Sequence, residues 1–452
     1  MQFDEEYYKS DDFQELLESY ESSMNAGSAP FMDADDLVDI ADYYNWQGDF
    51  DRAVQVVDYA LELYPGATLP NVFKARQALM GEDFQLARQY AAQILQQDDP
   101  DYHYLMAEIL VAEGHIDEAD RYLRDYGMTV DADEYEDFIK DCANLYIDYG
   151  ISDKAYEWMM RSRGDNSDDF KELMARTLFG LGKFKDSERL FNELIDNHPF
   201  STLYWNALAS SQYMRQQYSD SITSSEYAIA IDPNDPDALL TKANSLQQLG
   251  NAEEALKYFK RYIKATDDDD PQRGSVYQEM AFCCSDLGDT SQAMALLDQA
   301  AAYPCNPDEL QVIRGHLLLA GGQVEQAERA FQQAIVHSDT SPFILLRVIV
   351  SLYDNHYLEA SYTMFRKFFS LVGHIDPTFH DGYSYMALVC NDLGKAEEFL
   401  DYLAKAVDAN PHEAEIVLRH LFPEGMSAGD YVAYAREHVQ PKNNMTEKTQ
   451  TE

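Results

Sequence analysis

The stretch LYWNALASSQYMRQQYSDSITSSEYAIAIDP, residues 203–233, decides the fold class. Its first half sets the small residue Ala209 among larger apolar residues, and its second half sets Ala228 in the same way. Apolar residues in both halves recur at the spacing of an α-helix. Pro233 closes the second half because proline lacks an amide hydrogen and restricts the residue before it. The stretch therefore predicts two helices whose axes approach closely at small side chains.

The same two-helix pattern recurs along the chain with a period of about 34 residues. The small residue of the second helix is Ala53, Ala87, Ala119, Ala155, Ser187, Ser221, Ala255, Ala293, Ala327 and Ala360. The small residue of the first helix is Ala41, Ala75, Ala107, Ala143, Ala175, Ala209, Ala243, Ala281, Gly315 and Ala387. The turn between them contains Gly48, Gly114, Gly150, Gly182, Gly250, Gly288, Gly322 and Gly394. Because glycine takes a left-handed conformation without steric penalty, these glycines are expected to end the first helix.

These residues resemble the tetratricopeptide repeat family, whose units combine a Trp/Leu-Gly/Ala-Tyr first helix, an Ala-Phe-Ala second helix and a closing proline. Residues 203–233 carry the resemblance best, and similar units cover residues 34–411, about eleven of them. The last unit diverges because Phe399 stands where alanine is expected. The resemblance implies an all-α, right-handed superhelical solenoid that binds other proteins without catalysis.

The repeats leave three further segments, residues 1–33, 412–440 and 441–452. The first is acidic, and Phe13, Leu17 and Tyr20 have the spacing of one amphipathic helix, which is expected to cap the first repeat. The second predicts C-terminal capping helices. The third is polar and is expected to be disordered.

The charge balance restricts the partners. The chain has 81 Asp and Glu residues against 34 Lys and Arg residues, a formal net charge of -47, which would repel nucleic acid and favours basic proteins or peptides. The alternative is that acidity only keeps a large scaffold soluble. The acidic start of the chain is unlike a signal peptide, and no apolar run reaches the roughly 18 residues that span a bilayer. We therefore expect a cytoplasmic protein that does not bind membranes.

The sequence predicts no active site, no cofactor and no metal site. It contains no phosphate-binding loop, dinucleotide fingerprint or zinc-protease motif. His316 has no second ligand at metal-binding spacing, and the acidic run Asp267–Asp270 lacks the spacing of a calcium loop. Consecutive residues on a helix point in different directions, so Cys283 and Cys284 are interpreted as core residues.

The resemblance implies that the first helices of successive repeats line a concave groove. The residues expected to face a peptide there are Tyr104, Glu108, Lys140, Asn144, Arg176, Asn206, Ser210, Tyr213, Asn244, Gln247 and Gln278. Their amides and hydroxyls could bind a peptide backbone, although ordinary hydrated side chains are an equal alternative. Some family members clamp an acidic chaperone tail. Lys140 and Asn144 match that clamp, but Leu173 and Leu203 stand where its other polar residues belong, so this ligand is not expected.

In the repeats nearer the C-terminus, the equivalent positions of the first helices carry apolar residues. The expected apolar patch consists of Val312, Leu319, Leu345, Ile349 and Leu352. A patch of this kind does not face water undisturbed, so it predicts an apolar partner segment, a second copy of the chain or cover by the chain's own C-terminal segment. The sequence thus indicates a protein-binding scaffold, with self-association into a homodimer and mimicry of nucleic acid as alternatives.

Overall fold

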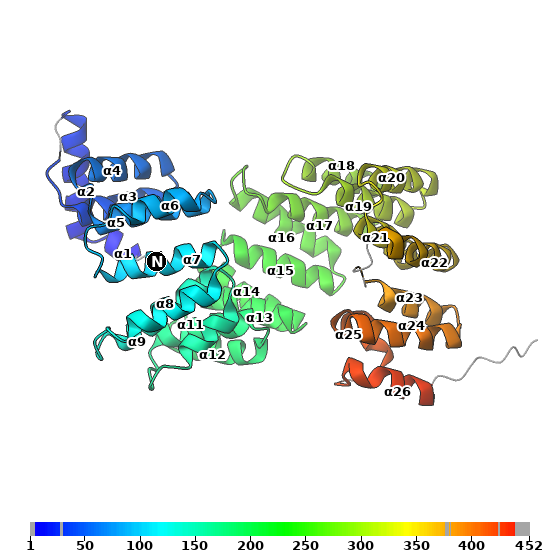
Figure 1. The fold of residues 1–452 in the computed structure, drawn as a ribbon. Coiled ribbons are helices and arrows are strands. Elements are labelled where there is room, and N and C mark those ends of the chain that lie inside the picture. Colours follow the sequence, from blue (N-terminus) through cyan, green and yellow to red (C-terminus); the bar gives the residue numbers. More distant parts are fainter. Residues whose placement is uncertain (1–4, 28–29, 376–378, 380, 424, 439–452) are drawn as a thin grey trace, which may run out of the picture. The chain divides into compact units, whose positions relative to one another are not determined.

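The computed structural model describes residues 5–27, 30–375, 379, 381–423 and 425–438. These described residues form helices and no strand (Figure 1), so the prediction of an all-α fold is confirmed. The expected disordered tail, residues 441–452, lies outside them. Internal contacts divide the chain into an N-terminal unit, Met1–Gln217, and a C-terminal unit, Tyr218–Glu452.

The N-terminal unit consists of antiparallel helix pairs that follow one another along the chain. Two helices precede the pairs, α1 (Glu5–Tyr8) and α2 (Asp11–Asn25). The pairs are α3 (Ala34–Trp46) with α4 (Phe50–Leu63), α5 (Thr68–Met80) with α6 (Phe84–Ala91), α7 (Pro100–Ala112) with α8 (Ile116–Gly127), α9 (Tyr135–Asp148) with α10 (Ser152–Met159), and α11 (Asp168–Gly180) with α12 (Phe184–Asn197). Helix α13 (Thr202–Met214) ends the unit.

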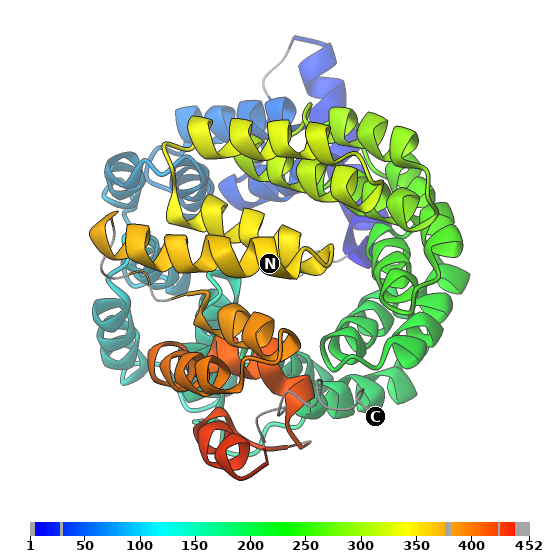
Figure 2. The same ribbon diagram turned by 90° about the vertical axis from the view of Figure 1, so that its right-hand side faces the viewer.

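The C-terminal unit begins with α14 (Tyr218–Ile231) and continues with the same kind of pair, visible from green to orange in Figure 2. The pairs are α15 (Pro236–Gln248) with α16 (Ala252–Ala265), α17 (Arg273–Asp286) with α18 (Thr290–Ala300), α19 (Pro307–Ala320) with α20 (Val324–His337), α21 (Pro342–Asp354) with α22 (Leu358–Ile375), and α23 (Tyr383–Asp392) with α24 (Ala396–Ala409). The helices α25 (Pro411–Leu418), η1 (Arg419–Leu421) and α26 (Ala428–His438) follow.

The turns inside the pairs depend on one left-handed residue. Gly48 has a φ of 78° and Gly322 a φ of 73°, and the other six glycines predicted at this position also have positive φ. Where the sequence lacks glycine, Glu82, Gln216 and His356 take the same conformation with φ of 56°, 61° and 64°. The geometry of the repeat therefore imposes the turn even on residues that favour it less.

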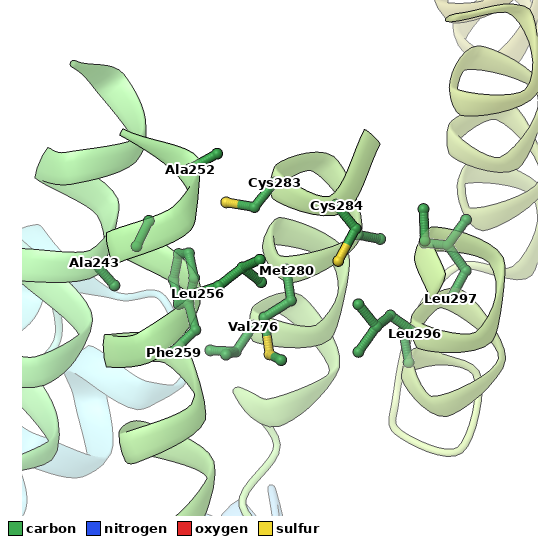
Figure 3. Packing of buried hydrophobic residues seen from close by; sticks show 14 of the residues in the cluster. Ala243, Ala252, Leu256, Phe259, Val276, Met280, Cys283, Cys284, Leu296 and Leu297 are labelled. Carbon is green, nitrogen blue, oxygen red and sulfur yellow. The ribbon is translucent and has the colours of Figure 1, made fainter. Parts of the chain in front are cut away.

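Small side chains bring the helix axes together in the core. In the C-terminal unit, Ala243, Ala255 and Ala281 are fully buried in one cluster, and Phe259 fills the space between their helices (Figure 3). Cys283 and Cys284 project from α17 in different directions into this cluster, and both are free thiols. The N-terminal helix α2 packs in the same manner, because its Phe13 shares a buried cluster with Leu37 of α3.

Candidate peptide-binding groove

The N-terminal unit carries a groove of about 660 Å³. Its walls come from the first helices of four successive pairs, α3, α5, α7 and α9, together with the start of α4. These first helices lie next to one another in sequence order (Figure 1). The groove runs across them, because each of the four contributes lining residues. The groove is thus a product of the repeat, and each repeat supplies side chains at equivalent positions.

The groove is acidic. Five carboxylates are among its lining residues, namely Asp42, Asp101, Glu108, Asp141 and Asp148, together with one guanidinium, that of Arg76. Arg76 Nε donates to Glu108 Oε2 at 2.8 Å, which links α5 to α7. Burial lowers the pKa of Arg76, but the nearby charges of Glu108, Asp101 and Asp42 together outweigh that effect and raise it. Arg76 is already paired with Glu108, and Asp148 is paired with Arg176, so among the described residues the groove carboxylates Asp42, Asp101 and Asp141 have no ion pair of their own.

The pKa values of the groove carboxylates reflect this shortage of cations. Burial, reinforced by the neighbouring charge of Asp39, raises the pKa of Asp42 to about 6. Burial also raises the pKa of Asp101, with Asp99 adding to the effect. The pKa of Asp141 is raised by the same desolvation, although a hydrogen bond from the Tyr104 hydroxyl opposes it. Each of these groups would be stabilised in its charged form by an added positive charge.

The groove also has an apolar portion. Phe50 and Met80 line it and are 65% and 88% exposed, respectively. Val54, Leu69 and Phe73 line it as partly buried side chains. Large apolar side chains this exposed are normal when scattered, but here two of them share one concave surface.

The structure places some of the predicted groove residues in this groove and others elsewhere. Tyr104, Glu108 and Asn144 line it. Arg176 lies beside it, because its guanidinium donates to Asn144 Oδ1 at 3.3 Å and to Asp148 Oδ1 at 3.4 Å. Lys140 is paired with Asp137 at 2.8 Å and also approaches Asp165, so it is engaged with its own unit.

The remaining predicted residues do not line the groove. Asn206, Ser210 and Tyr213 lie partly buried on α13 at the end of the N-terminal unit. Asn244, Gln247 and Gln278 belong to α15 and α17 of the C-terminal unit. Gln247 donates to Glu279 Oε2 at 2.8 Å within that unit. The polar cluster expected in the middle of the chain is therefore distributed over two units, and these residues remain predictions as ligand contacts.

The chain itself covers the predicted apolar patch, which was one of the three alternatives, so the patch is not a partner site. Val312, Leu319, Leu345 and Ile349 are all buried, and Leu352 is partly buried. Val312 and Leu319 belong to a cluster that Ile344 and Val348 of α21 complete, whereas Leu345 and Ile349 belong to the cluster that includes Phe365 and Tyr431. These side chains pack between neighbouring helix pairs, so the C-terminal unit covers them itself.

The acidic run Asp267–Asp270 is organised around a buried arginine. The guanidinium of Arg273, only 6% exposed, forms an ion pair with Asp268 and donates to the backbone carbonyl oxygen of Thr266 at 2.6 Å. Asp270 Oδ2 accepts from the Tyr262 hydroxyl at 2.7 Å. The run is thus part of the connection between α16 and α17.

The other candidates for chemistry are packed side chains. His316 Nδ1 lies 3.3 Å from Asn355 Nδ2, and burial lowers the pKa of the imidazole. Burial raises the pKa of Cys283 to about 12, so its thiol stays protonated at neutral pH. In the described part of the chain no group of three or more His, Cys, Asp or Glu residues could hold a metal ion.

Sequence reasoning missed most of the groove. It started the concave surface at Tyr104, although Arg76 precedes Glu108 by 32 residues and so occupies the equivalent position one repeat earlier. Extending the period back by one more repeat would have reached Asp42. The periodicity carried this signal, whereas the exposure of Phe50 and Met80 had no counterpart in the sequence.

Comparisons with known proteins identify the repeats. Two family models, each described as tetratricopeptide repeat, match residues 173–236 and 213–275. No curated protein matches the chain. Among the described residues, no helix has the length and apolar character needed to cross a membrane.

Several solved structures resemble the chain at low identity. A tetratricopeptide repeat protein from Parabacteroides merdae is 17% identical, with 55% of this chain and 97% of that chain covered and a TM-score of 0.43. The Cut9-Hcn1 hetero-tetramer structure of the APC/C is 15% identical over 91% of this chain and 93% of that chain, with a TM-score of 0.33. MamA of MSR-1 is 15% identical over 37% and 96%, with a TM-score of 0.33. The family models show tetratricopeptide repeats in residues 173–275, and the helix pairs with left-handed turns on either side have the same form.

Proposed function

We propose that this protein is a non-catalytic scaffold that binds a basic segment of a partner protein in the groove of its N-terminal unit. The observation that carries the proposal is the excess of carboxylates there, five against the single guanidinium of Arg76. That guanidinium is already paired with Glu108. Lysine or arginine side chains of a partner would supply the missing positive charge.

The energetics favour a cationic ligand. The raised pKa values of Asp42, Asp101 and Asp141 mean that their charged forms are poorly stabilised in the free protein. An ion pair formed in a partly desolvated groove is stronger than one on an open surface, because water screens it less. Binding of a cation should therefore lower these pKa values and release protons at mildly acidic pH.

The composition of the lining supports binding without chemistry. No serine, threonine, cysteine, histidine or lysine is among the residues that line the groove. The carboxylates of the lining therefore have no serine, threonine, cysteine or lysine nucleophile and no histidine beside them in the groove. We propose protein recognition as the role of the groove because its carboxylates are better suited to binding cations than to forming such a catalytic pair.

The alternative function, self-association into a homodimer, depended on an exposed apolar patch as the interface. The predicted apolar patch, residues 312, 319, 345, 349 and 352, is packed within the C-terminal unit. The basic-peptide proposal rests on residues that line an open groove, and we therefore favour it.

The test is binding of a fluorescent peptide that alternates lysine with serine, measured by anisotropy. We expect the peptide to bind the native protein and to dissociate as salt increases. The double variant Asp101→Asn with Asp141→Asn should reduce affinity about 10-fold. Asp125→Asn, which removes one exposed carboxylate on α8 outside the groove, is the control and should change it little. Equal affinities for the groove variant and the control would rule out the groove as the site.

A further inference from the structure

We propose that the partner segment is amphipathic: a large apolar residue seats against Phe50 and Met80, and lysines or arginines next to it reach Asp101 and Asp141. This inference rests on the proposed function and adds the identity of the recognised side chains. The occupant is a segment of another protein.

The apolar seat is built from two helices. Phe50 begins α4, Met80 ends α5, and both side chains are mostly exposed while they line the same groove. The partly buried side chains of Leu69 and Phe73 on α5 lie on that groove as well. Methionine is flexible and polarizable, so it adapts to aromatic and aliphatic partners alike. A ligand side chain here would remove apolar surface from water on both molecules.

The acidic seat comes from the next two first helices. Asp101 lies on α7 and Asp141 on α9, and their charges interact. Tyr104 donates its hydroxyl to Asp141, which orients that carboxylate. Since α3, α5, α7 and α9 contact one another in this order, apolar and acidic seats follow each other along the groove.

Arg76 separates the two seats. It lies on α5 and pairs with Glu108 of α7, and its positive charge acts on both Asp42 and Asp101. A ligand cation placed on the α5 side would meet this guanidinium, whereas one placed toward α9 would not. Arg76 thereby disfavours ligand cations at the apolar seat.

The experiment compares four peptides of equal length, three of which carry the same lysines. One carries leucine before a lysine cluster, one carries the leucine after it, one replaces the leucine by serine, and one replaces the lysines by serine. We expect both leucine-lysine peptides to bind about 10-fold more tightly than the lysine-serine peptide. The peptide without lysine should bind weakly.

Variants assign the effect to the apolar seat. The double variant Phe50→Ser with Met80→Gln should lower the affinity for the leucine-lysine peptides to that for the lysine-serine peptide. Phe200→Ser with Met128→Gln is a matched control, because these side chains are 82% and 81% exposed and do not line the groove. Circular dichroism verifies that all variants remain folded.

The outcomes separate the two proposals. If the lysine-serine peptide binds as tightly as both leucine peptides, the amphipathic ligand is refuted and the basic-peptide groove stands. If no lysine-containing peptide binds the native protein, the proposed function fails and this inference with it. If sedimentation finds a dimer that the Phe50→Ser and Met80→Gln variant dissociates, the apolar seat belongs to a second copy and the inference is overturned.

Discussion

Acidic side chains lie close together in both units, but the two acidic clusters differ in whether a guanidinium group contacts them. In the C-terminal unit, the run Asp267–Asp270 surrounds Arg273, whose guanidinium also reaches backbone carbonyls of the connection between α16 and α17. In the N-terminal unit, Asp42, Asp101 and Asp141 line an open groove whose one guanidinium is engaged by Glu108. Aspartate side chains thus stabilise a loop in the C-terminal unit, whereas in the N-terminal groove they lack a positively charged partner.

This difference shows which carboxylates are candidates for ligand binding in a chain with such a large acidic excess. A carboxylate held by a guanidinium and by hydroxyl or amide donors has its interactions satisfied within the fold. A carboxylate with a raised pKa in a concave surface retains interaction energy that a ligand can recover. The distinction depends on the partners of each acid, which become visible only in the folded chain.

The largest expected effect comes from removing the internal cation. Arg273→Met takes the donors away from Asp268 and from the carbonyl oxygens of Ile263 and Thr266. We expect the free energy of unfolding of the C-terminal unit to fall by about 1–3 kcal/mol, since the partly buried carbonyl oxygens of Ile263 and Thr266 lose a charged donor. Denaturant titration followed by circular dichroism measures it.

A control and a second probe localise that effect. Lys264→Met removes an exposed charge from the last turn of α16 and should have little effect. Trp46, Trp158 and Trp205 all lie in the N-terminal unit, so tryptophan fluorescence should shift less than circular dichroism for Arg273→Met. A stability equal to that of the Lys264→Met protein would show that Arg273 does not organise the acidic run.

A smaller effect is expected from adding one positively charged side chain to the groove. Asn45→Lys places an ammonium group on α3, three residues after Asp42, within reach on the helix surface. We expect affinity for the lysine-serine peptide to fall about 3- to 10-fold, because the new charge competes with the ligand. Gln93→Lys adds the same charge at an exposed position outside the groove. If both variants lose affinity equally, the effect is one of net charge and not of the groove.

The smallest expected effect is a gain in stability from neutralising Asp42. Its pKa rises from an ordinary value of 3.8 to about 6 in the folded chain, so the folded state holds this proton more tightly than the unfolded state. The native N-terminal unit therefore loses stability as pH rises from about 4 through 6, and Asp42→Asn should avoid this loss. We expect the variant to be about 1 kcal/mol more stable at pH 7.5 and to lose most of that advantage at about pH 3.5.

Tryptophan fluorescence during denaturation at the two pH values checks this prediction. Asp125→Asn should show the same stability relative to the native protein at both. An advantage of Asp42→Asn that grows on acidification would contradict the assigned direction of the pKa shift.

Much of the fold could be predicted from the sequence because its determinants are local. Gly48 and Gly322 end first helices at left-handed turns, and Ala209 and Ala243 bring helix axes together. The period also predicted the family and the presence of a concave surface. It did not predict that Glu82 would take the same left-handed turn, since only the surrounding helices impose that conformation.

The candidate site was less predictable because exposure depends on neighbouring repeats. Met80 and Ala320 occupy the equivalent position at the ends of first helices, and both are exposed. Only Met80 lines a groove, because the groove also needs side chains of α3, α4, α7 and α9, and the spacing of the repeat does not place these side chains. Similarly, the partners of Lys140 and Arg176 come from other helices, and no spacing in the sequence identifies them.

The most direct test of the groove is site-specific photocrosslinking to the lysine-containing peptide. A photoreactive phenylalanine analogue at position 50 lies in the groove wall, and one at position 200 is comparably exposed outside it. The account predicts a crosslink from position 50 that excess unlabelled peptide removes, and none above background from position 200. Equal crosslinking from both positions, or crosslinking from position 200 alone, would contradict the claim that the N-terminal groove binds basic segments.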